Sequence, residues 1–142
     1  MTRLSLTGGC LCGAVRYSYE GPLGGALGAI TVCHCSQCRR AQGYASAVAP
    51  ADAAGFSLTT GEAAMREFES SPGKLRVFCG VCGAPIYSRR VGLPGVLRLR
   101  IGSLDVAPPD LRVDAHIYTA GLPGWAAPDG AAPHYPGPEP AR

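Results

Sequence analysis

The 142-residue chain has the usual length of a single domain, and 16% of its residues are charged. Its formal net charge of +3 is far weaker than that of a dedicated nucleic-acid-binding domain, so a nucleic-acid partner is not expected. No segment approaches the roughly 20 apolar residues of a membrane span, and the N-terminus carries no apolar run of signal-peptide length. We therefore expect a protein of the reducing cytoplasm with no membrane partner.

The 20 glycines and 13 prolines favour many short strands joined by tight turns, so the chain is expected to be mostly β. In the first half, the expected strands are residues 13–19, 29–32, 45–49 and 56–58. Loops are expected at residues 23–28 and 50–55, where small residues, glycine or proline gather. Residues 36–42 predict one or two helical turns that stop at Gly43.

In the second half, the expected strands are residues 63–68, 74–78, 96–101 and 113–118. The first two are expected to form a hairpin around Ser70-Ser71-Pro72-Gly73, because these residue types suit a turn. The third strand shows the cleanest alternation. That alternation predicts its apolar residues facing the core, with Arg98 and Arg100 on a solvated face.

The last part of the chain reads as a tail. From Gly121 it is mostly glycine, alanine and proline. We expect this segment to lie over the domain, with Trp125 as its anchor. The chain is thus expected to form one domain, residues 1–125, followed by a tail, residues 126–142.

The seven cysteines fall into three clusters. These are Cys10-x-Cys12, Cys33-x-Cys35-x-x-Cys38 and Cys79-x-x-Cys82. Four thiolates make a closed tetrahedral zinc shell, and glycines beside the first and last clusters allow the tight turns that such ligands need. We therefore predict one structural zinc site on Cys10, Cys12, Cys79 and Cys82.

Two other uses of these cysteines are disfavoured. A disulfide framework fits poorly, because the number of cysteines is odd and no secretory signal is present. A thioredoxin-like use of Cys79-x-x-Cys82 lacks the surrounding βαβ pattern.

The middle cluster offers three thiolates whose spacing lets them converge on one ion and leave a fourth position open, as in catalytic zinc sites. Alternatively, His34 or His116 could close the site as a fourth ligand, or all seven cysteines could compete for a single zinc. Arg39 and Arg40 follow directly and could offset the negative charge or bind an anionic substrate group. His34 could serve the chemistry or only the packing.

Three motifs, in this order, resemble the glutathione-dependent formaldehyde-activating enzyme family, which includes centromere protein V-like proteins. They are Gly8-Gly9-Cys10-Leu11-Cys12-Gly13-Ala14-Val15-Arg16-Tyr17, Cys33-His34-Cys35-Ser36-Gln37-Cys38-Arg39-Arg40 and Phe78-Cys79-Gly80-Val81-Cys82-Gly83. The resemblance runs from about Gly8 to Trp125, and Ala115-His116-Ile117-Tyr118 resembles the family's closing strand.

The resemblance implies a β-tent-like fold of packed antiparallel sheets stapled by zinc. It implies a structural zinc on the four outer cysteines and a second zinc, at the active site, on Cys33, Cys35 and Cys38. It also implies the condensation of formaldehyde with the thiol of glutathione to S-hydroxymethylglutathione, and the reverse carbon–sulfur lyase step.

The leading hypothesis is therefore a zinc-dependent carbon–sulfur lyase that acts on an adduct between a small thiol, such as glutathione, and formaldehyde or a related electrophile. The alternative is a non-catalytic, zinc-stabilised module that binds a protein or nucleic-acid partner. A third hypothesis is zinc storage or sensing through the middle cluster. The sequence names no proton donor, and open strand edges could support a homodimer.

Overall fold

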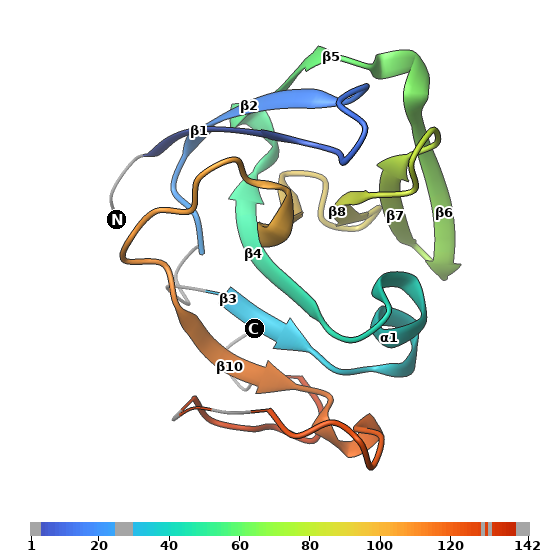
Figure 1. The fold of residues 1–142 in the computed structure, drawn as a ribbon, viewed down its shortest axis with the longest axis vertical. Coiled ribbons are helices and arrows are strands. Elements are labelled where there is room, and N and C mark those ends of the chain that lie inside the picture. Colours follow the sequence, from blue (N-terminus) through green and yellow to red (C-terminus); the bar gives the residue numbers. More distant parts are fainter. Residues whose placement is uncertain (1–3, 25–29, 129, 131, 139–142) are drawn as a thin grey trace.

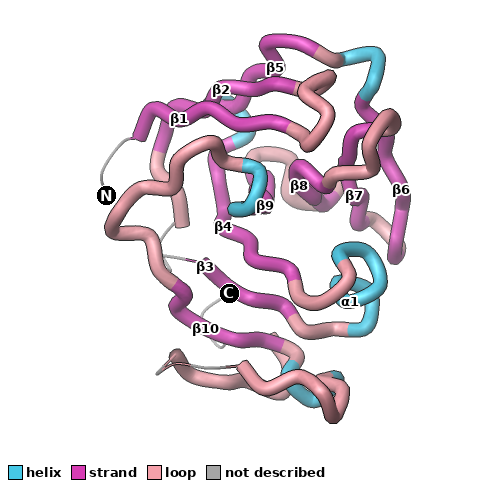
Figure 2. Tube along the Cα trace, viewed as in Figure 1, coloured by secondary structure: helices cyan, strands magenta, loops and turns pink. Residues whose placement is uncertain are grey.

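The computed structural model describes residues 4–24, 30–128, 130 and 132–138 (Figures 1 and 2). Across these residues, ten strands and one α-helix are found. The strands are β1 (Leu4–Gly9), β2 (Arg16–Gly21), β3 (Ile30–Cys33), β4 (Ser46–Asp52), β5 (Phe56–Thr60), β6 (Met65–Ser71), β7 (Lys74–Cys79), β8 (Pro85–Arg90), β9 (Val96–Arg100) and β10 (Val113–Ile117). The helix is α1 (Ser36–Gln42). This composition confirms the mostly β prediction.

The described strands form two sheets. The smaller has three strands in the order β1-β2-β5, and the larger has seven in the order β10-β3-β4-β9-β8-β7-β6. Neighbouring strands are antiparallel throughout, except that β10 runs parallel to β3. In Figure 1 the smaller sheet lies at the top of the molecule, while β3 and β10 lie at its lower end beside α1.

The main core is built around two tyrosines of β2, Tyr17 and Tyr19, which are fully buried together with Leu99 of β9. The ring of Tyr17 stacks on Phe56, with 4.9 Å between the ring centroids. Its hydroxyl lies 2.6 Å from the Ser103 hydroxyl. Aromatic rings with a satisfied polar tip thus join β2, β5 and β9, and burial of this apolar area is the main stabilising term.

Several expected elements are confirmed. The helix spans Ser36–Gln42 and ends at Gly43, whose φ of 85° is left-handed and whose N–H bonds to the Arg39 carbonyl at 2.8 Å. The expected hairpin is β6 paired with β7, closed at Pro72 and Gly73.

Other expectations need correction. The loop expected at 50–55 is wrong in its first part, because β4 continues through Pro50 to Asp52. Pro50 is tolerated there because a proline lacks only the N–H donor, and its carbonyl accepts from Gly24 N–H at 2.9 Å. Strands β1 and β8 were not anticipated. Most of the loop expected at 23–28, and the first residue of the strand expected at 29–32, lie outside the described residues.

Residues 133–137 lie beside β10 and the residues that follow it. His116 N–H donates to the Pro133 carbonyl at 2.9 Å, and Tyr135 N–H donates to the His116 carbonyl at 2.8 Å. Trp125, however, is not a buried anchor: it is 68% exposed, and its ring packs beside Tyr44 with 5.7 Å between centroids. No helix among the described residues is long and apolar enough to cross a membrane.

We expect Gly8→Ala to destabilise the protein by about 1–3 kcal/mol, because overpacking a well-filled interior forces its surroundings to move. A Cβ at this position would collide with the Ser103 carbonyl and with the Tyr17 hydroxyl. Urea unfolding measures the change. The control is Gly102→Ala, where no atom lies within 4 Å of the new Cβ. Equal stability of the two variants would contradict this packing.

Candidate metal centres

The first candidate metal centre joins the two sheets. Cys10 and Cys12 follow β1, Cys79 ends β7, and Cys82 lies in the turn before β8. The four sulfurs all lie within 4.8 Å of one another, with 3.6 Å between Cys10 and Cys12 and 3.9 Å between Cys12 and Cys79. Four sulfurs about 2.3 Å from a tetrahedral zinc are about 3.8 Å apart, so this donor set fits that ion.

Backbone N–H groups orient these sulfurs. Val15 N–H donates to Cys10 Sγ at 3.2 Å, and Val81 N–H donates to Cys79 Sγ at 3.4 Å. The backbone N–H groups of Ala84 and then Cys12 lower the pKa of Cys82 to about 6. Tight turns aim these N–H groups at the sulfurs, and such turns need glycine. Gly83, for example, has a φ of 80°, which lies in the left-handed region that favours glycine.

The second candidate centre is made by the junction of β3 and α1. Cys33 is the last residue of β3, Cys35 caps the helix, and Cys38 lies in its first turn. The three sulfurs lie within 4.8 Å of one another. Cys38 N–H donates to Cys35 Sγ at 3.3 Å, which is an N-cap bond made by sulfur in place of oxygen. These cysteines therefore form a group that could hold a metal ion.

Hydrogen bonds distribute the negative charge unevenly among the three sulfurs. Bonds from Cys33 and Cys35, and then the Arg76 guanidinium, lower the pKa of Cys38 well below its ordinary value. The bonds that Cys33 makes with Cys35 and then with Cys38 raise the pKa of Cys33. Arg76 Nη2 lies 3.6 Å from Cys38 Sγ. Among the three sulfurs, these contacts most favour the charged form of Cys38, and a bound cation would favour the charged form of all three.

His34 and His116 lie elsewhere. His34 is 3% exposed, and its Nε2 lies 2.9 Å from His116 Nδ1. Burial, and then the neighbouring His116, lower the pKa of His34. Among the described residues, neither histidine nor a carboxylate joins the three-cysteine group as a fourth ligand. The two cysteine groups are also separate, so the seven sulfurs do not converge on one point.

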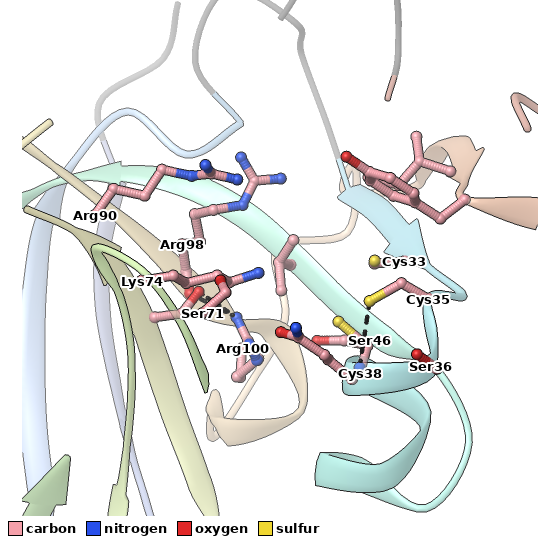
Figure 3. A pocket seen from close by; sticks show the side chains of 15 residues that line it. Cys33, Cys35, Ser36, Cys38, Ser46, Ser71, Lys74, Arg90, Arg98 and Arg100 are labelled. Carbon is pink, nitrogen blue, oxygen red and sulfur yellow. Dashed lines mark hydrogen bonds between the residues drawn. The ribbon is translucent and has the colours of Figure 1, made fainter. Parts of the chain in front are cut away.

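A pocket of about 360 Å³ opens beside the three cysteines (Figure 3). Its lining combines the start of α1 with one face of the seven-stranded sheet. Directly paired residues of neighbouring strands share a face. The pairs Cys33–Ser46, Ser88–Arg98 and Lys74–Arg90 therefore put thiol, hydroxyl and cationic groups on the same side of the sheet.

Four cations line this pocket, and no described residue in its lining is acidic. They are Lys74, Arg90, Arg98 and Arg100. Figure 3 shows the first three on one side of the space and the cysteines on the other. Burial, and then the charge of Arg76, lower the pKa of Lys74, while burial lowers the pKa of Arg100 to about 10. The site is therefore built to receive an anion.

The expected solvated face of β9 is wrong. Arg100 is only 4% exposed. Its Nε donates to Gln42 Oε1 at 2.6 Å and its Nη1 donates to Ser88 Oγ at 3.1 Å. The predicted alternation of leucine and arginine is present, but neither face of β9 is an open surface. The leucine face packs in the core, and the arginine face borders α1 and the pocket.

The structure places the predicted arginines apart from this lining. Arg39 and Arg40 lie at the end of α1, and neither lines the pocket. The lining residues that sequence reasoning missed include Lys74, Arg90 and Tyr118. None of them belongs to a recognisable motif, and only the folded arrangement brings them together. For Arg98 and Arg100 the signal was present, since two cations on one strand face opposite a leucine face mark a charged surface that α1 could cover.

Comparisons with known proteins support one family. The family model described as glutathione-dependent formaldehyde-activating enzyme matches residues 5–121. A search of the curated proteins finds no match. Among solved structures, a crystal structure of a Rhodobacter sphaeroides protein is similar, with a TM-score of 0.61 and 23% sequence identity. That alignment covers 73% of this chain and 92% of the other, and at this identity it supports the fold alone.

We expect the purified, reduced protein to hold about two metal ions per chain, with different effects on the fold. Cys82→Ser should lose about one ion and much of the resistance to unfolding, because its centre ties β1 to the β7–β8 turn. Cys35→Ser should lose about one ion with little loss of stability. Elemental analysis and thermal unfolding measure both. Full metal content in both variants would exclude these two centres.

Proposed function

The chain belongs to the glutathione-dependent formaldehyde-activating enzyme family, and we propose that it is a zinc-dependent carbon–sulfur lyase. It would join or cleave an adduct between a small thiol such as glutathione and formaldehyde or a related electrophile. One observation carries the proposal: the pocket has three cysteine sulfurs on one side and cationic side chains on the other.

The cations suit the anionic ends of a thiol such as glutathione, which carries two carboxylates. Arg90 and Arg98 come from neighbouring strands and face the same space, so they can bind a carboxylate with charge-assisted hydrogen bonds. Arg100 is already hydrogen-bonded to Gln42 and Ser88, so it supplies positive charge at a fixed position in the pocket wall. Binding at these groups would orient the thiol toward the cysteines.

Cys33, Cys35 and Cys38 are the residues that would hold the active-site zinc. When bound, that ion would supply a Lewis acid that favours the thiolate form of a thiol at neutral pH. Cys10, Cys12, Cys79 and Cys82 would hold the structural zinc. The substrate roles predicted for Arg39 and Arg40, the chemical role of His34, and the division into residues 1–125 and 126–142 stay predictions.

The proposed step involves no oxidation or reduction. The thiol releases its proton to solvent, and its sulfur forms a bond with the carbon of formaldehyde. The electron pair of the carbonyl double bond moves to oxygen, which takes up a proton. Lys74 is the proton donor that we propose, because it lines the pocket and burial lowers the pKa of its amine, which makes its ammonium form a stronger acid. Cleavage is the same step in reverse.

Two substitutions should separate binding from chemistry. Arg98→Gln removes a charge that contacts the substrate and should raise KM about tenfold, since charge-assisted hydrogen bonds contribute about 1.5–3 kcal/mol. Lys74→Gln should lower kcat by about tenfold or more, with a smaller change in KM. NMR exchange between free glutathione and S-hydroxymethylglutathione, at added formaldehyde, measures the rate in both directions.

Two controls frame this experiment. Arg112→Gln removes an exposed arginine outside the pocket lining and should leave both constants unchanged. Cys35→Ser should remove the catalysed exchange while the protein stays folded. If Cys35→Ser exchanged every tested thiol adduct at the rate of the unaltered chain, the three-cysteine centre would have no part in the reaction.

A further inference from the structure

A second hollow, of about 310 Å³, lies between α1 and β6. Its lining residues are Gln37, Arg40, Ala41, Phe68, Ser70 and Arg76. Only Gln37 also lines the pocket beside the three cysteines. A molecule bound in this hollow would therefore leave that pocket open, and its binding would not depend on the proposed function.

The hollow is bordered by side chains whose buried polar atoms have no hydrogen-bond partner. Among the described residues, three buried side-chain atoms are in this position: Ser70 Oγ, Arg76 Nε and Arg76 Nη1. Arg76 is 9% exposed, and only its Nη2 has a contact, with Cys38 Sγ at 3.6 Å. Buried polar groups are nearly always paired, and an unpaired charged donor is costly. All three atoms belong to residues of one hollow, which points to a bound acceptor.

The rest of the lining is apolar. Phe68 is 62% exposed although it is a large aromatic side chain. It also borders a neighbouring hollow of about 330 Å³, which shares Ala41, Phe68 and Arg76 with the first. That neighbouring hollow is walled by Val77, Phe78, Pro85 and Tyr87. No described residue in either lining is acidic. The cations of the two linings are Arg40, Arg76 and Arg100, and Arg100 also lines the cysteine pocket.

We propose that these two hollows form one binding site for an amphipathic carboxylate, meaning a single carboxylate on an apolar or aromatic body. The carboxylate accepts hydrogen bonds from Arg76 and from the Ser70 hydroxyl, with Arg40 adding attraction from the surface. The apolar body lies against Phe68 and extends toward Val77 and Pro85. A small inorganic anion would leave that apolar surface uncovered, so the apolar body is part of the recognition.

Benzoate is the probe, titrated into the full, metal-loaded chain by isothermal titration calorimetry or by chemical-shift mapping. Phe68→Ala and Ser70→Ala should each weaken binding several-fold, and Arg76→Gln should weaken it about tenfold or more. Phe68 is exposed and the Ser70 hydroxyl has no partner, so neither change should disturb the fold. These two variants keep the test decisive if Arg76→Gln disturbs Cys38. Arg98 lines the cysteine pocket and neither of the two hollows, so Arg98→Gln should leave the affinity for benzoate unchanged.

Two further ligands test the chemical class. Benzamide keeps the ring without the charge, and acetate keeps the charge without the ring, so each should bind at least tenfold more weakly than benzoate. The proposal is overturned if benzoate does not bind at millimolar concentration, or if Phe68→Ala and Ser70→Ala leave its affinity unchanged. It is equally overturned if Arg98→Gln abolishes binding, or if inorganic phosphate binds more tightly than benzoate.

Discussion

The burial of opposite charges against each other is the constraint on which this structure depends. Cys38 is 2% exposed and Arg76 9%, and a charged group taken out of water is costly unless an opposite charge lies close by. Cys38 and Arg76 approach to 3.6 Å across the junction of α1 and β7. The helix therefore sits where its cysteines meet the cationic face of the sheet. That face cannot close into an apolar core, so the space beneath the helix remains a pocket.

The seven-stranded sheet consequently has two faces with different tasks. On β9, Leu99 packs with Tyr17 in the core beneath the smaller sheet, while Arg100 points to the opposite side. The four-cysteine group joins the end of β1 to the turn between β7 and β8, and so holds the smaller sheet over the apolar face. One centre is suited to fixing the architecture, and the other is placed on the face that the architecture leaves polar.

Sequence reasoning reached the cysteine groups and most of the elements because those signals are local. Cys35 and Cys38 are separated by one helical turn, and the stop at Gly43 is a backbone requirement of a single residue. The pocket was not reached, because Lys74, Arg90 and Arg98 meet only through the register of three strands. Whether an arginine face is solvated depends on what covers it, and here α1 does. The expectation that Trp125 is a buried anchor is wrong for a related reason. A large side chain becomes buried only where other parts of the fold cover it, and the sequence pattern does not show what covers Trp125.

The hydrogen bonds between residues 133–137 and the end of β10 also determine how the molecule meets its neighbours. An outer strand offers a row of unused backbone groups to any other chain, and natural sheets guard against this. Here His116 exchanges backbone bonds with Pro133 and Tyr135, and Tyr118 N–H bonds to the Gly137 carbonyl at 3.0 Å. Residues 133–137 thus cover this edge of the sheet and protect it from edge-to-edge aggregation. A chain cut before Pro133 would expose the outer edge of β10. The shortened protein would then be more prone to aggregate through backbone pairing with another chain.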